Sequence, residues 1–161
     1  MTSCFEVETS PTGTPRNVAG YEVRGVRTSA ELEAAMALRH DVFCLEQGVP
    51  VSEEHDGRDH LGLHLIAIDG EGNVLGTCRL VFVGNTVQFS RLAIVQAARR
   101  RGLATMLLQA ADAEARKRGA TRLVLHAQTY ARALYERAGY LARGREFREA
   151  GIEHVAMEKI L

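Results

Sequence analysis

The sequence predicts an α/β fold in which helices flank one mixed, mostly antiparallel sheet. Apolar and polar residues alternate at 21–27, as in a half-buried strand, and three further strands are expected at 63–68, 74–83 and 86–95. Short turns containing Gly and Asn join the last three stretches, so these should form an antiparallel meander. Apolar residues then recur at helical spacing between Arg101 and Arg118, and Gly119 is a stop signal.

A first helix and a loop precede the meander. Ser29 is the expected N-cap of this helix, whose apolar stripe continues to about Gly48. Residues 49–59 should form a loop, because they include a proline and a glycine and little apolar periodicity. The loop carries an acidic cluster: Glu53, Glu54, Asp56 and Asp59. Such a cluster is most often a solvated surface, and it can also attract a cationic substrate.

The elements after the meander complete the order β-α-βββ-α-β-α-ββ. The helix that follows the meander should bury one face, made of Leu103, Met106, Leu107, Ala110 and Ala113. We expect a short buried strand at 123–125 and a helix at 129–137. A closing hairpin should follow, with strands at 140–147 and 153–161. This hairpin offers an edge on which a homodimer could form.

Length and composition limit the class of protein. The 161 residues fit a flexible leader at 1–20, rich in Pro, Thr and Gly, and a single domain at 21–161. Lys+Arg and Asp+Glu both number 20, so the basic excess typical of nucleic-acid binding is absent. No apolar run reaches the ~20 residues that span a bilayer. The three cysteines lie far apart without a CxxC pair, which favours a reducing compartment, and we expect a cytoplasmic protein.

Residues 92–108 carry the most informative pattern, a strand that leads through a short loop into a helix. The first turn of a helix has unpaired N–H groups and a partial positive charge, so it attracts anions. Gly102 and Ala104 leave room for a ligand there, and Arg99 to Arg101 add positive charge. The pattern indicates a diphosphate cradle, with an arginine-rich solvated loop as the alternative. It matches neither GxxxxGK(S/T) nor GxGxxG, the fingerprints of nucleotide binding.

Two motifs resemble those of the GCN5-related N-acetyltransferases, the GNAT family. The first, Arg99-x-x-Gly102-x-Ala104, is similar to the Q/R-x-x-G-x-G/A acyl-CoA motif of that family. The second is similar to the family segment N-x-x-A-x-x-(F/L)-Y-x-x-x-G-F, and reads here Gln128-x-x-Ala131-x-x-Leu134-Tyr135-x-x-x-Gly139-Tyr140. Gln128 stands in place of the usual Asn. The resemblance covers about residues 21–161, and residues 42–50 and 126–128 look like the YjcF/ElaA-type branch of the family.

The resemblance implies a GNAT-like acyl-CoA N-acyltransferase fold with acetyl-CoA as co-substrate. In this fold the third meander strand splays away from the strand at 123–126, and the pantetheine arm inserts between them like an added strand. The implied cofactor-binding groups lie in three places: the strand residues Leu92, Ala93 and Ile94; the cradle residues Arg99, Arg100, Arg101, Gly102, Leu103, Ala104 and Thr105; and Gln128.

The resemblance also implies the reaction: the amine of a small-molecule acceptor attacks the thioester directly, and Tyr135 is the general acid for the departing thiolate. From the residues alone, a core aromatic is the favoured interpretation of Tyr135, because tyrosines are commonly half-buried structural residues. The general base stays open, because the third meander strand has no carboxylate between Gln88 and Arg91. The candidates are Glu53, Glu54, Asp56, His126 or a water chain. A non-catalytic acyl-CoA-binding regulator is the alternative function.

Another stretch is dense in the side chains that bind metals: His55, Asp56, Asp59, His60 and His64. Gly57 and Gly62 interrupt any helix that would align these groups on zinc, so we expect no metal. No helix-turn precedes Arg99 to support DNA recognition. The predicted partner is therefore a small-molecule amine, with no nucleic acid and no membrane. No motif identifies the acceptor, because loops and the closing hairpin build its side of the site.

Overall fold

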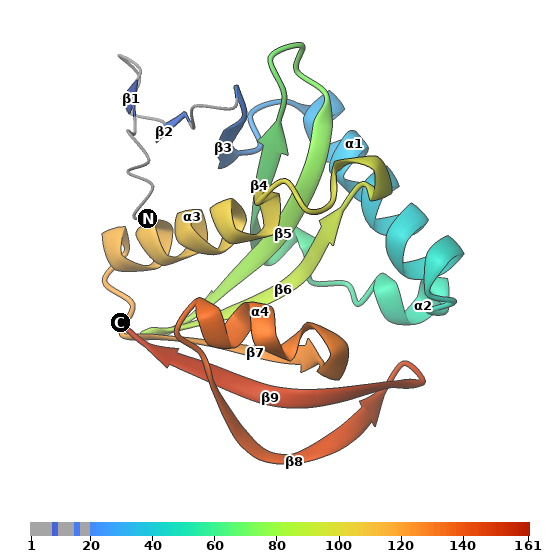
Figure 1. Ribbon diagram of the computed structural model, residues 1–161, viewed down its shortest axis with the longest axis vertical. Helices are drawn as coiled ribbons and strands as arrows, with labels where there is room; N and C mark the ends of the chain where they lie inside the picture. The colour runs from blue at the N-terminus through green and yellow to red at the C-terminus, as the bar shows by residue number, and fades with distance from the viewer. Residues whose placement is uncertain (1–7, 10–14, 17–19) are drawn as a thin grey trace.

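The computed structural model describes residues 8–9, 15–16 and 20–161, so all but three short pieces of the expected leader lie outside the described residues. Figure 1 shows helices on both faces of one twisted sheet, with the C-terminal hairpin along one edge. The strands are β1 (Glu8–Thr9), β2 (Pro15–Arg16), β3 (Glu22–Gly25), β4 (Gly62–Ile68), β5 (Val74–Val83), β6 (Thr86–Ile94), β7 (Arg122–Gln128), β8 (Leu141–Glu149) and β9 (Ile152–Ile160). The helices are α1 (Ser29–Arg39), the π-helical η1 (His40–Glu46), α2 (Val51–Glu54), η2 (Asp59–Leu61), η3 (Gln96–Ala98), α3 (Leu103–Lys117), η4 (Thr129–Ala131) and α4 (Arg132–Arg137).

The sheet has the strand order β1-β2-β3-β4-β5-β6-β7-β9-β8. The expected meander of β4, β5 and β6 is confirmed, as is the closing hairpin of β8 and β9. Within the described residues, β6 and β7 are the one parallel pair, and their register ends at Gln88 opposite Val124. Beyond this point the two strands separate. The sheet is therefore mixed and mostly antiparallel, with the splayed central pair that the sequence predicts.

Alternating side chains on the central strands separate two apolar layers. On β4, Leu65 and Ala67 belong to the large core that packs beneath α3. Ile66 and Ile68 point to the opposite face and pack against Ala35 of α1. Because successive side chains of a strand point to opposite faces, α1 and α3 must cover different sides of the sheet. The cofactor cradle at the start of α3 and the helices η1 and α2 therefore lie on different faces.

A bulge in β6 changes which side chains face which layer. The register against β5 shifts between Thr77 and Arg79, so one more residue of β6 is accommodated there, and Arg91 has a φ of 59°. Before the bulge, Phe89 is part of the α3 core. After it, Ala93 packs with the α1 layer instead. The bulge thus re-aims the end of β6, next to the point where β7 separates from it.

Some local expectations differ from the structure. Thr28, not Ser29, is the N-cap of α1, because its hydroxyl accepts a hydrogen bond from the Glu31 N–H at 3.1 Å. The core face of α3 is rotated from the expected stripe, so that Ala113 is exposed. The buried residues of this helix are Leu103, Leu107, Leu108, Ala111 and Ala115. Within the described part of the chain, no helix is both long enough and apolar enough to span a bilayer.

Candidate active site

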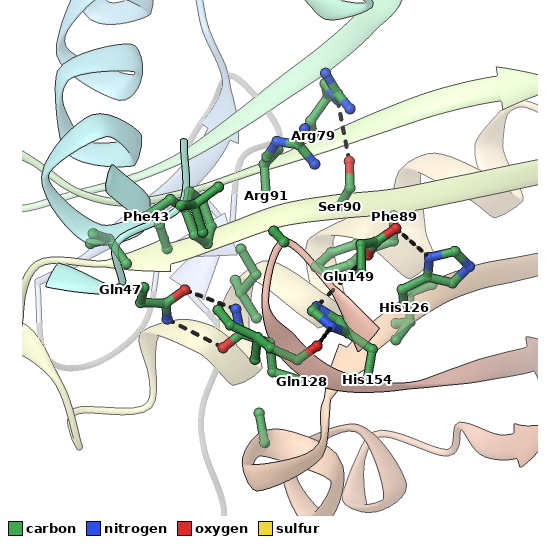
Figure 2. A pocket seen from close by; sticks show the side chains of 18 of the residues that line it. Phe43, Gln47, Arg79, Phe89, Ser90, Arg91, His126, Gln128, Glu149 and His154 are labelled. Atoms are coloured by element: carbon green, nitrogen blue, oxygen red, sulfur yellow. Dashed lines mark hydrogen bonds and ion pairs between the residues drawn. The ribbon is translucent and has the colours of Figure 1, made fainter. Parts of the chain in front are cut away.

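A cavity of about 920 Å³ opens where β6 and β7 separate. In Figure 2, Ser90 and Arg91 lie on the β6 side of this cavity, and His126 and His154 lie on the β7 and β9 side. Residues of η1, α2 and α4 complete its lining. Of the predicted site residues, those that line it are Leu92, Ala93, Ile94, Arg99, Ala104, Gln128 and Tyr135. The fold therefore brings both sequence motifs to one cavity.

The start of α3 forms a second, smaller cavity of about 290 Å³. Gly102 is the N-cap with a φ of 81°, a conformation that glycine adopts without strain. An added Cβ at Gly102 would meet no atom within 4 Å, so the space beside it is open. No side chain caps α3, which leaves the first N–H groups of the helix available to an anion. The predicted residues that line this cavity are Ile94, Arg99, Arg100, Gly102, Leu103, Ala104 and Thr105.

The three consecutive arginines have different surroundings. Arg99 is held by Glu46, with both guanidinium–carboxylate contacts at 2.8 Å, and its Nε donates to the Ile94 carbonyl at 3.1 Å. Arg101 lines neither cavity and donates to the Tyr21 hydroxyl at 3.0 Å. Arg100 lines the smaller cavity and is exposed. Of the three arginines, Arg99 and Arg100 therefore line the cradle, and the charge of Arg99 is already paired with Glu46.

Tyr135 projects from α4 into the cavity and is 8% exposed. Its ring makes edge-to-face contacts with Phe89 and Tyr140, at centroid distances of 6.3 and 6.0 Å. Burial raises the pKa of the Tyr135 hydroxyl above its ordinary value of 10.0. The group therefore keeps its proton at neutral pH, as a general acid must.

Gln128 lies at the end of β7 and faces Gln47 of the η1 end. Each amide donates to the other: Gln128 Nε2 to Gln47 Oε1 at 2.8 Å, and Gln47 Nε2 to Gln128 Oε1 at 3.2 Å. Gln47 Nε2 also donates to the Tyr130 hydroxyl at 3.4 Å. This reciprocal pair connects the two walls of the cavity. An asparagine, which the family motif usually has here, is shorter by one methylene, so the pairing depends on the glutamine.

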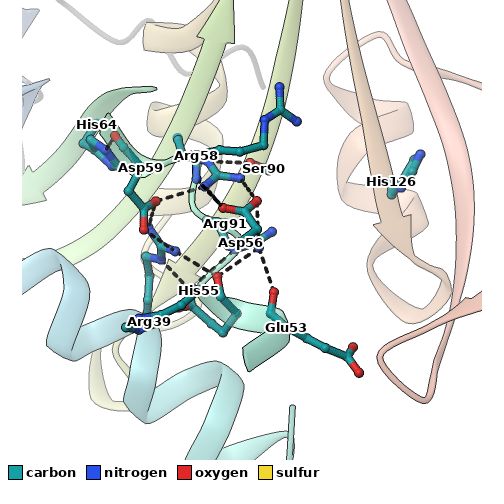
Figure 3. A network of polar contacts seen from close by, with 12 residues as sticks. Arg39, Glu53, His55, Asp56, Arg58, Asp59, His64, Ser90, Arg91 and His126 are labelled. Carbon is teal, nitrogen blue, oxygen red and sulfur yellow. Dashed lines mark hydrogen bonds and ion pairs between the residues drawn. The ribbon is translucent and has the colours of Figure 1, made fainter. Parts of the chain in front are cut away.

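The acidic loop is not the solvated surface that its composition suggests. Three of its carboxylates and three arginines form a network of ion pairs (Figure 3). Arg39, 1% exposed, contacts Glu54 at 2.6 Å and Asp59 at 2.7 Å. The network is completed by Arg79, which contacts Asp56 at 2.7 Å and Asp59 at 2.9 Å, and by Arg91, which contacts Asp56 at 3.3 Å.

This network makes Glu54 and Asp56 poor candidates for the general base. The hydrogen bond from Arg79 is the main reason that the pKa of Asp56 lies well below its ordinary value of 3.8. Glu54 is 3% exposed and paired with Arg39. A carboxylate that is already bound to a guanidinium does not readily accept a proton. Glu53 is different, because its side chain is exposed and lines the cavity.

The structure adds two cavity residues that the sequence did not indicate, Glu149 and His154. Glu149 lies at the end of β8, with Oε1 3.3 Å from His126 Nδ1 and Oε2 3.8 Å from His154 Nε2 (Figure 2). His126 was a candidate base from the sequence. Its two neighbours could be found only from the register of β7, β9 and β8, which no motif specifies. Within the part of the chain that the structure describes, no three His, Cys, Asp or Glu side chains are grouped to hold a metal.

Known proteins are similar to this chain in sequence and in fold. A family model described as an acetyltransferase (GNAT) domain matches residues 41–161. The N-acetyltransferase YjcF of Bacillus subtilis (strain 168) is 31% identical over 134 residues, which are 83% of this chain and 95% of that protein. A solved acyl-CoA N-acyltransferase from Pseudomonas aeruginosa is 32% identical with a TM-score of 0.74, covering 86% of this chain and 98% of that one. Escherichia coli ElaA has a TM-score of 0.77 at 19% identity, covering 86% and 99%, and so supports the fold alone.

The splayed sheet and the helix-start cradle define an acyl-CoA-dependent acyltransferase. The family match then identifies the class, and the chain belongs to the GNAT family of N-acetyltransferases. It is an acetyl-CoA-dependent N-acetyltransferase, as the sequence resemblance implies.

The residues present fit acetyl-CoA in two respects. From Phe89 onward, the β7-facing edge of β6 pairs with no strand in the described part of the chain, which suits an extended pantetheine arm. The open, uncapped start of α3 suits a diphosphate.

Proposed function

We propose that this enzyme transfers the acetyl group from acetyl-CoA directly to the amine of a small-molecule acceptor, with Tyr135 as the general acid. One observation carries the proposal: a single cavity is lined at one end by Ile94, Arg99 and Ala104, near the cradle, and at the other by His126 and His154. Both substrates could therefore meet in it without a covalent enzyme intermediate, and no cysteine within residues 20–161 lines the cavity.

The proposed binding mode assigns the diphosphate to the first N–H groups of α3, at Leu103, Ala104 and Thr105. Arg100 adds the free positive charge. The pantetheine arm would extend along the free edge of β6 at Leu92, Ala93 and Ile94, with the Gln128 amide at the far side of the separation. The Ile94 carbonyl already accepts one hydrogen bond, from Arg99 Nε at 3.1 Å, and has one lone pair left for the arm.

The proposed chemistry divides two proton transfers between two faces of the cavity. The amine lone pair forms the new C–N bond while the C–S bond breaks, and the sulfur leaves with that electron pair. Tyr135 gives the sulfur its proton, a transfer for which its retained hydroxyl proton is suited. The ammonium form of the acceptor must first lose a proton. The exposed carboxylates of Glu53 and Glu149 line the cavity and favour such a cationic acceptor.

Calorimetry and a thiol-release screen test the proposal together. Purified protein should bind acetyl-CoA, and at least one member of a panel of amines and amino sugars should cause release of the CoA thiol. Mass spectrometry should then find that amine acetylated on nitrogen. Acetyl-CoA binding without turnover on any amine would instead support a non-catalytic regulator, and a lack of binding would contradict both functions.

A further inference from the structure

The acceptor side of the cavity is one face of the sheet made by β7 and β9. Along β7, Leu125 and Ala127 are buried in the core beneath α3 and α4. Since side chains alternate, His126 and Gln128 must point to the opposite face, where both line the cavity. His154 is paired in register with Gln128 and shares that face. Tyr135 belongs to the core side, because its ring packs on Phe89. The tyrosine and the histidines therefore approach the cavity from opposite sides.

On this face, Glu149 lies between two histidines that differ in exposure. The His126 side chain is 54% exposed, whereas that of His154 is 9% exposed. His154 Nδ1 is 2.7 Å from the Ile152 carbonyl, which can only accept, so this nitrogen carries the proton. The Phe147 ring contacts both imidazoles, edge-on to His126 at 5.0 Å and stacked on His154 at 6.0 Å. His154 is thus fixed, and His126 is the accessible member of the pair.

The contact between His126 and Glu149 selects a tautomer. With Nδ1 3.3 Å from the carboxylate, the neutral imidazole donates its Nδ1–H to Glu149, and the lone pair is then on Nε2. The polar contact of the His126 ring is made by Nδ1, so Nε2 has no hydrogen bond or ion pair with the described residues. An exposed imidazole with a free Nε2, oriented by a carboxylate, is the arrangement that general-base catalysis requires.

We propose that His126 is the general base that deprotonates the acceptor ammonium, and that Glu149 is a positioning residue that holds its Nδ1–H; the inference rests on the proposed function. His126 Nε2 takes one proton from R–NH3+, and the resulting amine attacks the thioester. As the amide forms, the nitrogen loses a second proton. The first proton goes to bulk water when His126 is regenerated. The second replaces, by way of solvent, the proton that Tyr135 gives to the leaving thiolate. The sum is R–NH3+ plus acetyl-CoA giving N-acetylamine, CoA thiol and H+.

Several charged groups face His126 and will affect how its protonation depends on pH. They come from four elements: Glu149 and Arg143 on β8, His154 and Glu158 on β9, Arg91 on β6 and Glu53 on α2. Arg143 is paired with Glu158 at 2.8 Å, and Arg91 with Asp56, so these charges largely cancel. Glu149 forms no ion pair with an arginine or a lysine among the described residues, and its carboxylate remains the charged group nearest to His126.

Three matched variants test the role of His126. His126→Gln removes the base and keeps a polar side chain, and Glu149→Gln removes the carboxylate charge. His60→Gln is the control, because His60 is an exposed histidine that lines neither cavity. We measure kcat/KM against pH on the best acceptor from the screen, and acetyl-CoA affinity by calorimetry.

The expected results distinguish a base from a structural residue. His126→Gln should lower kcat/KM by about 10²-fold at neutral pH, with unchanged acetyl-CoA affinity. The loss should shrink as pH rises, because an acceptor that is already deprotonated needs no base. Glu149→Gln should shift the acidic limb of the wild-type profile to lower pH, with a smaller loss of about 10-fold. Imidazole nitrogen shifts in NMR spectra of wild-type protein should show the Nδ1–H tautomer for His126.

Two outcomes would overturn the inference while leaving the proposed function in place. In the first, the His126→Gln profile coincides with that of wild type and of His60→Gln. In the second, His126→Gln keeps the acidic limb and Glu149→Gln loses it, which would make the carboxylate itself the base. If wild-type protein acetylates no amine, the proposed function fails and the inference fails with it.

Discussion

Tyr135 and Tyr140 have similar surroundings but different access to the cavity. Both rings are buried and contact one another edge-on. Burial raises the pKa of each hydroxyl above the ordinary value of 10.0. However, only Tyr135 lines the cavity. The Tyr140 hydroxyl has no hydrogen-bond partner among the described residues and does not line the cavity. The two residues therefore form a matched pair for testing a catalytic role against a packing role.

We expect Tyr135→Phe to lower kcat by about 10²–10⁴-fold without changing acetyl-CoA affinity, because the change removes a positioned general acid and keeps the ring. Tyr140→Phe should leave kcat unchanged. It should also raise the free energy of unfolding by about 1 kcal/mol, since it removes a buried hydroxyl without a partner. Kinetics on the best acceptor and denaturant melts measure both effects. A loss below about fivefold in Tyr135→Phe would make the tyrosine a positioning residue only.

At this scale, sequence reasoning could predict candidate residues that sit at fixed offsets along one segment. Tyr135 and most of the residues from Arg99 to Thr105 line the two cavities, whereas Arg101 lines neither. Sequence reasoning failed where side chains from distant segments meet. The ion pair that neutralises Arg99 joins it to Glu46, which is 53 positions away in the sequence. Neither local motif contains information about a contact over that distance. Glu149 likewise reaches His126 only through the pairing of three strands.

The start of α3 is the element that should bind the diphosphate. Gly102 is a poor place to test this role, because its φ of 81° strains any other residue, and a loss of binding there could come from the backbone. Thr105 lies in the first turn, is exposed and lines the smaller cavity. An acidic residue in a first turn stabilises a helix. A carboxylate at position 105 should therefore affect diphosphate binding without destabilising the helix.

Thr105→Glu should weaken acetyl-CoA binding by at least about 10-fold, or about 1.4 kcal/mol, because its carboxylate would repel the diphosphate. The melting temperature should stay the same or rise slightly. Gln109→Glu is the control, since it places the same charge on an exposed position of the same helix outside both cavities. Calorimetry with acetyl-CoA measures the affinities. Equal affinity in Thr105→Glu and wild type would contradict the cradle.

The elements differ in how far the sequence determines them. The meander was predictable because short turns leave β4, β5 and β6 no other way to pair. The ion pairing of the loop at 49–59 was not predictable, because its carboxylates pair with arginines from α1, β5 and β6. Arg39, Arg79 and Arg91 look like ordinary surface residues in the sequence. Their positions become apparent only when the helix and the strands are assembled.

For the whole molecule, the ion-pair network couples α1, the acidic loop and the strands β5 and β6. It contains three arginines and three carboxylates, so its formal charges cancel. The pKa of Asp56 is lowered mainly by its hydrogen bond with Arg79. Burial acts to raise the pKa of Asp59, but the hydrogen bonds and charges of Arg39 and Arg79 lower it overall. Such carboxylates stabilise the fold at a pH above their ordinary value of 3.8 and lose this contribution as the pH falls.

We therefore expect the melting temperature to fall steeply as the pH drops below about 4. Asp56→Asn should cost about 1.5–3 kcal/mol of unfolding free energy at neutral pH, because Arg79 is 2% exposed and would lose a charged partner. The melting temperature of the same variant should fall less steeply with decreasing pH, since one carboxylate with a lowered pKa is gone. Thermal melts of both proteins from about pH 7 to about pH 3 test this. Parallel curves would show that Asp56 does not contribute to acid stability.

The bulge at Arg91 accommodates one extra residue in β6, and this residue sets which face each later side chain of the strand takes. Before it, odd-numbered side chains such as Phe89 enter the α3 core, and after it the odd-numbered Ala93 enters the α1 layer. A substitution at position 91 preserves the number of residues in the strand. Deletion of Arg91 would instead remove the extra residue, so that Ala93 and Ile94 keep their partners Thr77 and Gly76 and their present faces. The deletion should thus cost the ion pair between Arg91 and Asp56 and leave the facing of the strand intact.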